Sequence, residues 1–366
     1  MGGVPSFTLT KPKTGPVVGL DIEAGSIAAT EVASNGSAQV TASAIGSLEP
    51  GAFHEGEVLD TERLAAALKS FFAEHKLSKQ VRLGIGNQRL VVRVMRLPAI
   101  EDPKEMDAAV RFQAQEQVPM PLDQAVLEYQ VVAGVPAEEG GSAQLDVVVV
   151  AARREMVSSF VEPIRRAGLE PVGVDLAAFG MIRALAGSGG PSGDTADPGA
   201  QPLGPVLYCN LGDVTNLAVA RGRACLFTRV SQVGLEAISA PLISARGLTS
   251  EHVAQWLSYV GLEAPVEELD GDPEIVAEVR RTLEQGVASL VDELRLSLDY
   301  YGAQEAAVAV ERIALCGPGS AIAGVPAQME ALLGLPISVS RPVALGGFDE
   351  PAAARLTVPF GLALGD

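Results

Sequence analysis

Two short stretches of this chain repeat one pattern of apolar and polar residues, the first near its start and the second past its middle. Residues 17–26 and 206–215 each hold an apolar run that ends in a short polar side chain, with a hydroxyl residue a few positions later. The matched residues are Asp21 and Ser26 in the first stretch and Asn210 and Thr215 in the second. Each stretch continues as an apolar run that ends near a turn, at Asn35-Gly36 or Gly222, which predicts a β-hairpin. Two hairpins of matching chemistry predict two lobes that face a shared ligand.

The chemistry of these hairpins favours a phosphate ligand. A tight turn directs successive backbone N–H groups into one concavity, which suits an anion. The hydroxyl groups can donate to phosphate oxygens, and the carboxylate of Asp21 can hold the water shell of Mg²⁺. The same pattern is also compatible with two unrelated hairpins that end in polar residues.

Composition and charge narrow the class of protein. At 366 residues the chain is long enough for two or more domains. Hydrophobic residues make up 48% and aromatic residues only 4%, and this favours an α/β protein whose strands are covered on both faces. The net charge of −18 argues against nucleic acid or anionic lipid as a general partner, because both require a basic surface.

Cysteine spacing and hydropathy indicate a cytosolic protein. The three cysteines lie far apart in the sequence, which fits neither a disulfide framework nor a zinc site and indicates a reducing compartment. No apolar run is long enough to span a membrane, so we expect no direct membrane span. The first residues lack the pattern of a secretory signal.

Local signals predict how the chain is organised between the two hairpins. Residues 87–150 are predicted to form a small strand–helix–strand–strand module. The segment 187–204 is dense in glycine, proline and serine and is predicted to be a flexible linker, after which the second lobe begins at Pro205. Four acidic residues are predicted to begin helices: Asp60, Asp102, Asp175 and Asp272.

A glycine-rich turn follows the apolar residues 312–315. Gly317-Pro318-Gly319-Ser320 comes directly after this predicted strand and precedes a helix predicted over 325–333. Glycine at such a turn allows a ligand to approach the backbone. Strand–turn–helix crossings also use glycine for steric reasons alone, so both interpretations stay open for Gly317 and Gly319.

The order of hairpin, linker, hairpin and glycine turn resembles the actin-like ATPase superfamily, and within it the PilM family of type IV pilus assembly proteins, relatives of FtsA. Each stretch taken alone is a weak signal, but their combination is specific. In these stretches Glu128 lies where the family commonly has aspartate before tyrosine. The stretches similar to the family are 18–22 in the opening strand, 108–122 in the inserted helix and its Pro-x-Pro exit, 126–131, 315–325 at the adenosine site, and 360–364 at the end.

This resemblance implies an α/β, actin-like (RNase H-like) fold of two lobes, with a small βαββ module inserted in the first. It further implies that ATP with Mg²⁺ binds between the lobes. It also implies a partner: the short N-terminal cytosolic peptide of PilN, an inner-membrane protein of the pilus assembly platform. The groove for that peptide is expected beside the inserted module. Binding to this partner would place the protein at the inner face of the cytoplasmic membrane.

The resemblance also predicts the domain bounds. Residues 1–86 and 151–186 would form the first lobe, and 87–150 the inserted module. The second lobe would comprise 205–345, with a helical subdomain at about 246–310. The segment 346–366 would return to the first lobe.

Departures from the family pattern fall on the nucleotide site. Glu23 replaces the usual glycine after the opening strand, and a carboxylate beside a phosphate is repulsive unless a cation compensates. Ala28 replaces a lysine, and Asn210 replaces an aspartate. The residues that remain compatible with binding are Asp21, Ser26, Asp175, Gly212, Thr215, Gly317 and Gly319. We therefore expect weakened ATP binding, at most a weak ATPase, and a fold kept as a scaffold.

Proteins of the same fold also have functions other than that of a scaffold. A sugar kinase could use Asp175 as its base, but the sequence offers no second cluster of polar sugar ligands. An FtsA-like membrane-associated filament would need an amphipathic tail, and the chain ends at Leu364-Gly365-Asp366. A related secretion protein of this fold would continue into a membrane helix. The sequence favours the pilus scaffold.

Overall fold

The first lobe is built on a six-stranded mixed sheet whose order is β1-β11-β7-β2-β3-β4. Its strands are β1 (Phe7–Thr8), β2 (Val17–Ile22), β3 (Ser26–Ser34), β4 (Ala38–Ser47), β7 (Gln80–Ile85) and β11 (Glu170–Leu176). The computed structural model describes residues 7–8, 15–34, 38–135, 142–186, 204–304 and 307–365. β2 and β3 pair antiparallel and form the first predicted hairpin.

The second lobe contains a five-stranded sheet of order β14-β13-β12-β15-β16. Its strands are β12 (Val206–Leu211), β13 (Thr215–Arg221), β14 (Ala224–Ser231), β15 (Arg312–Cys316) and β16 (Ile337–Val339). β12 and β13 pair antiparallel and form the second predicted hairpin. β12 also pairs in parallel with β15, which brings the glycine-rich turn after β15 to the hairpin end of the sheet.

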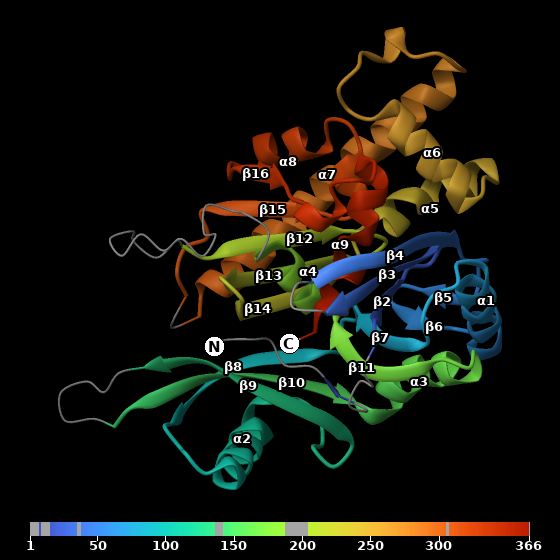
Figure 1. The fold of residues 1–366 in the computed structure, drawn as a ribbon. Helices are drawn as coiled ribbons and strands as arrows, with labels where there is room; N and C mark the ends of the chain where they lie inside the picture. Colours follow the sequence, from blue (N-terminus) through green and yellow to red (C-terminus); the bar gives the residue numbers. More distant parts are fainter. Residues whose placement is uncertain are drawn as a thin grey trace.

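Two helices lie between the two sheets (Figure 1): α4 (Ala177–Ala186) and α9 (Glu350–Leu364). α9 packs against β2, β3 and α4. One face of the second sheet, including Tyr208 and Ala218, joins the core of the first lobe, while the opposite face, including Leu207 and Leu217, packs in the second core. Because both faces of this sheet are covered, its central strands are nearly continuous apolar runs in the sequence.

The inserted module is a three-stranded antiparallel sheet with one helix (Figure 1). Its elements are β8 (Val91–Pro98), α2 (Pro103–Gln117), β9 (Ala125–Val135) and β10 (Gln144–Arg153). Met106 and Val110 of α2 contribute to a small core of its own together with Val147 and Val149 of β10. The other face of β10, including Val148 and Val150, packs into the core of the first lobe, which fixes the module to that lobe.

The remaining elements complete the two lobes. The first lobe carries β5 (Phe53–His54), β6 (Glu57–Val58), α1 (Thr61–Glu74) and α3 (Arg154–Arg166). The second lobe carries α5 (Leu235–Arg246), α6 (Ser250–Val260), α7 (Pro273–Gly302) and α8 (Val325–Leu333), with the short helices η1 (Val266–Glu268), η2 (Pro318–Ala321) and η3 (Val343–Leu345).

The structure confirms the α/β, actin-like fold of two lobes with an inserted βαββ module. It also confirms three of the four predicted helix starts, because Asp60, Asp102 and Asp272 each accept a hydrogen bond from a backbone N–H of the first turn. The domain bounds stay a prediction. The predicted turn at Asn35-Gly36 and nearly all of the predicted linker lie outside the described residues.

The prediction that Asp175 begins a helix is wrong. β11 continues through Leu176 because its pairing with β7 continues to the register pairs Asp175–Gly84 and Leu176–Ile85. α4 begins only after this pairing ends. Across the described ranges, which leave gaps between residues 7 and 365, no helix combines the length and the hydropathy needed to cross a membrane.

Candidate functional site

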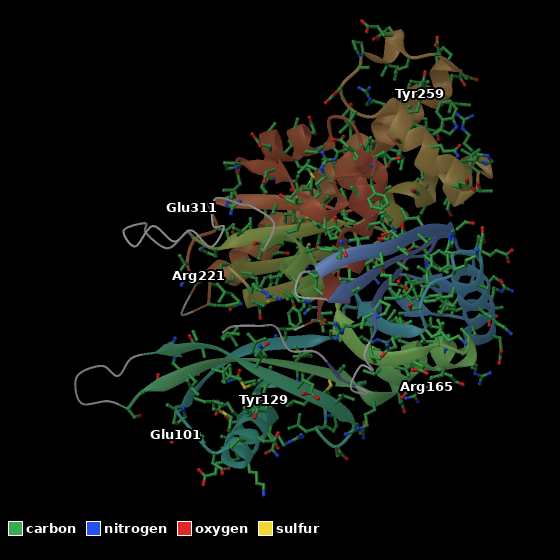
Figure 2. The ribbon with its side chains drawn as sticks, viewed as in Figure 1. Glu101, Tyr129, Arg165, Arg221, Tyr259 and Glu311 are labelled. Carbon is green, nitrogen blue, oxygen red and sulfur yellow. The ribbon has the colours of Figure 1, made fainter. Side chains whose placement is uncertain are left out.

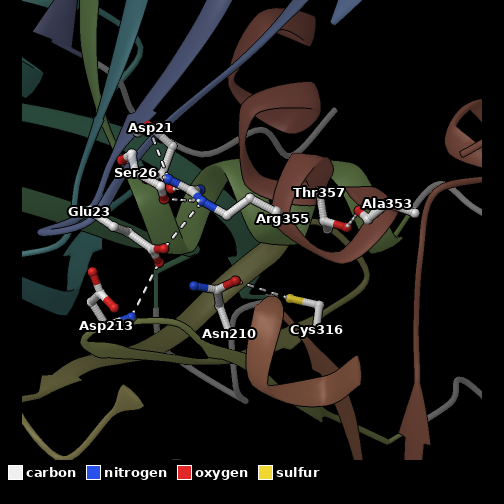
Figure 3. A network of polar contacts seen from close by, with 9 residues as sticks. All are labelled: Asp21, Glu23, Ser26, Asn210, Asp213, Cys316, Ala353, Arg355 and Thr357. Atoms are coloured by element: carbon white, nitrogen blue, oxygen red, sulfur yellow. Dashed lines mark hydrogen bonds and ion pairs between the residues drawn. The ribbon is translucent and has the colours of Figure 1, made fainter. Parts of the chain in front are cut away.

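The ends of the two hairpins meet in the interior of the molecule (Figure 3). Asp21 at the end of β2 and Asn210 near the end of β12 are both buried, with 8% and 5% of their surface exposed. Glu23, in the turn after β2, accepts a hydrogen bond from the backbone N–H of Asp213 in the turn after β12, at 3.3 Å from N to Oε1. The two stretches that match in sequence are therefore in contact across the lobes.

Arg355 of α9 holds the first hairpin together. Its Nη1 lies 2.5 Å from Oδ2 of Asp21, and its Nε lies 3.0 Å from Oγ of Ser26 and 3.2 Å from Oε2 of Glu23. Its Nη2 also donates to the backbone carbonyl oxygens of Asp21 and Ser26. The arginine side chain is only 7% exposed, so its charge is balanced by these acids rather than by water.

Arg355 is a site residue that no local sequence pattern identifies. Its one available signal was its position, since it is a lone basic residue in the apolar segment 351–364. A charged residue that is buried in such a helix needs an acidic partner. The partner is in β2, far away in the sequence, so no local pattern names it.

Two carboxylates cross between the lobes in opposite directions. Glu23 of the first hairpin reaches the backbone of the second at Asp213. The carboxyl group of Asp213 in turn faces the backbone N–H groups of Gly25 and Ala24 in the first hairpin, which act to lower its pKa. We call Glu23 and Asp213 the exchanged carboxylates.

Burial dominates the titration of both exchanged carboxylates. It raises the pKa of Glu23 to about 8, against the opposing effect of the Arg355 guanidinium. Burial also raises the pKa of Asp213, with a further contribution from the negative charge of Glu236, while Arg355 and the two N–H donors act in the opposite direction. The site therefore holds a high density of acid around one guanidinium.

Gly212 leaves the space that Glu23 fills. A Cβ atom at Gly212 would lie 2.0 Å from Oε1 of Glu23, so the Glu23 carboxyl group would have to move to make room for it. The carboxylate of Glu23 thus lies directly over the glycine of the second hairpin. In this arrangement a phosphate at Gly212 would meet the Glu23 carboxyl group.

The polar residues of the second hairpin make local, uncharged hydrogen bonds. Oδ1 of Asn210 lies 3.7 Å from Sγ of Cys316, which donates to it (Figure 3). Oγ1 of Thr215 donates to the backbone carbonyl of Val233 at 2.7 Å. These contacts hold the turn in place without a charge.

The glycine-rich turn packs closely on β12. Gly317 has a φ of +84°, and a Cβ there would lie 2.6 Å from Oδ1 of Asn210. A Cβ at Gly319 would lie 2.3 Å from Cγ of Leu211. Steric packing against β12 therefore suffices to explain both glycines, the second of the two interpretations left open by the sequence.

Two other residues singled out in the sequence have clear placements. Asp175 forms an ion pair with Arg183 of α4, and both side chains are shielded from solvent. This ion pair joins β11 to α4. Ala28 is fully buried in β3 and pairs with Asp21 across the first hairpin.

Within the described segments, no group of three or more His, Cys, Asp or Glu side chains is arranged to hold a metal ion. The carboxylate of Asp21, expected to hold the water shell of Mg²⁺, is instead paired with Arg355.

A second, more exposed contact joins the lobes beside the hairpins. Nδ1 of His54 in β5 lies 2.5 Å from Oε1 of Glu236 at the start of α5. The backbone N–H of Glu55 donates to the other oxygen of Glu236, and Gln232 donates to the side chain of Glu55. The hydrogen bond to Glu236 raises the pKa of His54.

A groove of about 650 Å³ runs beside the inserted module. It lies between the start of β9 and the outer face of α3, and Arg165 projects from α3 at this position (Figure 2). The residues that line it are Val126, Arg154, Val157, Ser158, Val161, Glu162, Arg165 and Arg166. The groove therefore combines an apolar floor with several arginine side chains.

Comparison with known proteins agrees with this architecture. A solved structure titled as the PilM–PilN type IV pilus biogenesis complex matches with 25% identity and a TM-score of 0.74, over 96% of this chain and 98% of that chain. The ethanolamine utilization protein EutJ from Carboxydothermus hydrogenoformans matches at 13% identity with a TM-score of 0.54, over 98% of this chain and 93% of that one. At this identity the second likeness bears on the fold alone.

A further structure is MreB 5 of Spiroplasma citri bound to AMPPNP, at 12% identity and a TM-score of 0.49, with 96% of each chain covered. The bound nucleotide is a property of that protein. The family model described as type IV pilus assembly protein PilM matches residues 19–355, which is most of the chain. This chain belongs to the PilM family of type IV pilus assembly proteins.

Proposed function

We propose that this protein is a cytoplasmic scaffold of type IV pilus assembly that binds the N-terminal cytosolic peptide of a PilN-like inner-membrane protein. The match to the PilM–PilN complex over nearly the whole chain carries this proposal. Through this peptide the scaffold would be held at the inner face of the membrane, next to the rest of the pilus assembly platform.

The groove beside the inserted module has the features that a short peptide needs. Val157 and Val161 provide apolar surface that a peptide side chain can cover. Arg154, Arg165 and Arg166 place positive charge at the same groove, in a protein whose net charge is −18. An extended peptide would complement this surface if its apolar side chains covered the valines. Its acidic side chains or backbone carbonyl groups would face the arginines.

Filling the groove tests this proposal. Ser158 is exposed on α3 and lines the groove, so Ser158→Tyr adds bulk there without disturbing the core. Titration with a peptide of the candidate partner's cytosolic tail should give binding to the unmodified protein and about tenfold weaker binding to Ser158→Tyr. Ser244→Tyr, at an exposed position of α5, is the matched control and should bind normally. Equal affinity in all three proteins would reject the groove, and no binding to any would reject the partner.

We also propose that the protein binds Mg-ATP at best weakly and hydrolyses little of it. Three features support this proposal. The side chain of Glu23 lies over Gly212, Ala28 stands where the family has a lysine, and Asn210 carries no charge. Calorimetric titration with Mg-ATP should give weak or undetectable heats. Tight binding, or steady turnover that Asp21→Ala abolishes, would contradict it.

A further inference from the structure

The ends of both hairpins present backbone N–H groups toward the opposite lobe, and those groups already have partners. The N–H of Asp213 donates to Glu23, and the N–H groups of Ala24 and Gly25 face the carboxyl group of Asp213. Turns of this kind bind anions because successive N–H groups converge on one point. Here carboxyl groups of the protein itself occupy that point.

Glu23 accepts from the backbone donor of the second hairpin and also fills the space beside it. Oε1 of Glu23 lies only 2.0 Å from the position that a Cβ of Gly212 would take, so this oxygen fills the concavity over the glycine. The other oxygen of the same carboxyl group faces the guanidinium of Arg355, at 3.2 Å from Nε. The side chain of Glu23 is only 11% exposed. Its carboxyl group therefore contacts both a backbone donor and a cation, which are the contacts that a bound phosphate would make.

We propose that the carboxyl groups of Glu23 and Asp213 fill the phosphate positions of both hairpins and hold the two lobes together without a nucleotide. Each carboxylate belongs to one lobe and is bound by the other, so opening the lobes would leave both carboxylates and three backbone N–H groups without these partners. Arg355 supplies the cation that makes this cluster of acids tolerable. This inference rests on the proposal of a weak nucleotide site and is independent of the partner peptide.

The first test is to remove these two carboxyl groups and titrate with Mg-ATP. The Glu23→Ala/Asp213→Ala variant frees the backbone donors and removes one acid from Arg355, and it should bind Mg-ATP tighter than the unmodified protein by about tenfold or more. Glu49→Ala, at an exposed acidic residue, is the control for loss of charge and should bind as weakly as the unmodified protein. Circular dichroism establishes that each variant is folded, and Glu23→Ala alone serves if the double variant does not fold.

Above pH 8, where the Glu23 side chain is ionised, Glu23→Gln separates occupancy from charge. The amide keeps the size of the side chain and an oxygen that can accept from Asp213, but it carries no charge. If Glu23 excludes phosphate by filling its position, Glu23→Gln should show no gain in Mg-ATP affinity while Glu23→Ala does. Equal gains in the two variants would overturn the inference, because charge repulsion alone would then explain the weak binding.

The second test measures whether the lobes stay together. Small-angle X-ray scattering of the unmodified protein should give the same radius of gyration with and without Mg-ATP. The double variant should expand without nucleotide and contract when Mg-ATP is added. A folded double variant that gains no affinity and keeps its radius would overturn the inference and leave the scaffold proposal intact. Tight Mg-ATP binding by the unmodified protein would instead reject the weak site on which the inference rests.

Discussion

The two hairpins share a backbone framework but are held in place by different forces. In the first, Asp21 and Ser26 both contact the guanidinium of Arg355. In the second, Asn210 and Thr215 make neutral hydrogen bonds to groups within their own lobe. A matched sequence pattern therefore predicted the position of the hairpins and not their energetics. The first hairpin depends on a buried charge, and the second does not.

The largest expected effect is the loss of Arg355. Arg355→Leu would leave Asp21 buried and unpaired, which should lower the free energy of unfolding by about 3–5 kcal/mol. Arg221, exposed at the end of β13 (Figure 2), provides the control. Arg221→Leu should change the free energy of unfolding by less than about 0.5 kcal/mol. Urea denaturation of both variants measures the difference. Equal losses would show that the ion pair does not hold the first hairpin.

The matched hydroxyl residues give a direct comparison of the two hairpins. Ser26→Ala removes an acceptor from a charged donor and should cost about 1.5–3 kcal/mol, whereas Thr215→Val removes a neutral bond to Val233 and should cost about 0.5–1.5 kcal/mol. Denaturant unfolding of the two variants tests the order. A larger loss for Thr215→Val would reverse the comparison.

The contact between Glu23 and Gly212 can be tested with a double-mutant cycle. Gly212→Ala should cost about 1–3 kcal/mol of unfolding free energy, because its methyl group would overlap the Glu23 carboxyl group. In the Glu23→Ala background the same change should cost less, with a coupling of about 0.5–3 kcal/mol. Gly134→Ala, where a Cβ meets no atom within 4 Å, is the control. Strict additivity would place the two residues out of contact.

The smallest expected effect is the pH dependence of the exposed interlobe contact. The bond to Glu236 raises the pKa of His54 above its ordinary value of 6.5, and Glu55 acts in the same direction. A raised histidine pKa stabilises the folded state fully below 6.5, and this stabilisation is lost as the pH rises through the folded-state pKa. The advantage in melting temperature of the unmodified protein over His54→Gln should therefore shrink across this window. The effect should stay within about 1 kcal/mol, because the side chain is half exposed. A pH-independent difference would exclude the ion pair.

Local sequence signals predicted the framework well because local physics determines it. Asp60, Asp102 and Asp272 cap helices through bonds to the next few residues, and such bonds are visible in a single sequence. Asp175 misled for the same reason, since the extension of β11 is set by its pairing with β7 and not by its neighbours in the chain.

The chemistry of the site was only partly predictable. The sequence placed Asp21, Asn210, Gly212 and Thr215 together and marked Glu23 as a departure. It did not reveal that Asp213 reciprocates Glu23 or that Arg355 pairs with Asp21 and Glu23. These contacts join residues from opposite lobes and from the last helix, and only the folded chain brings them together.

Amide hydrogen exchange of the nucleotide-free protein tests the central claim most directly. If the exchanged carboxylates occupy the hairpin donors, the amides of Ala24, Gly25 and Asp213 should exchange as slowly as those of the adjoining strands, and Mg-ATP should change nothing. Fast exchange at all three amides, slowed only by Mg-ATP, would contradict the account and indicate an open nucleotide site.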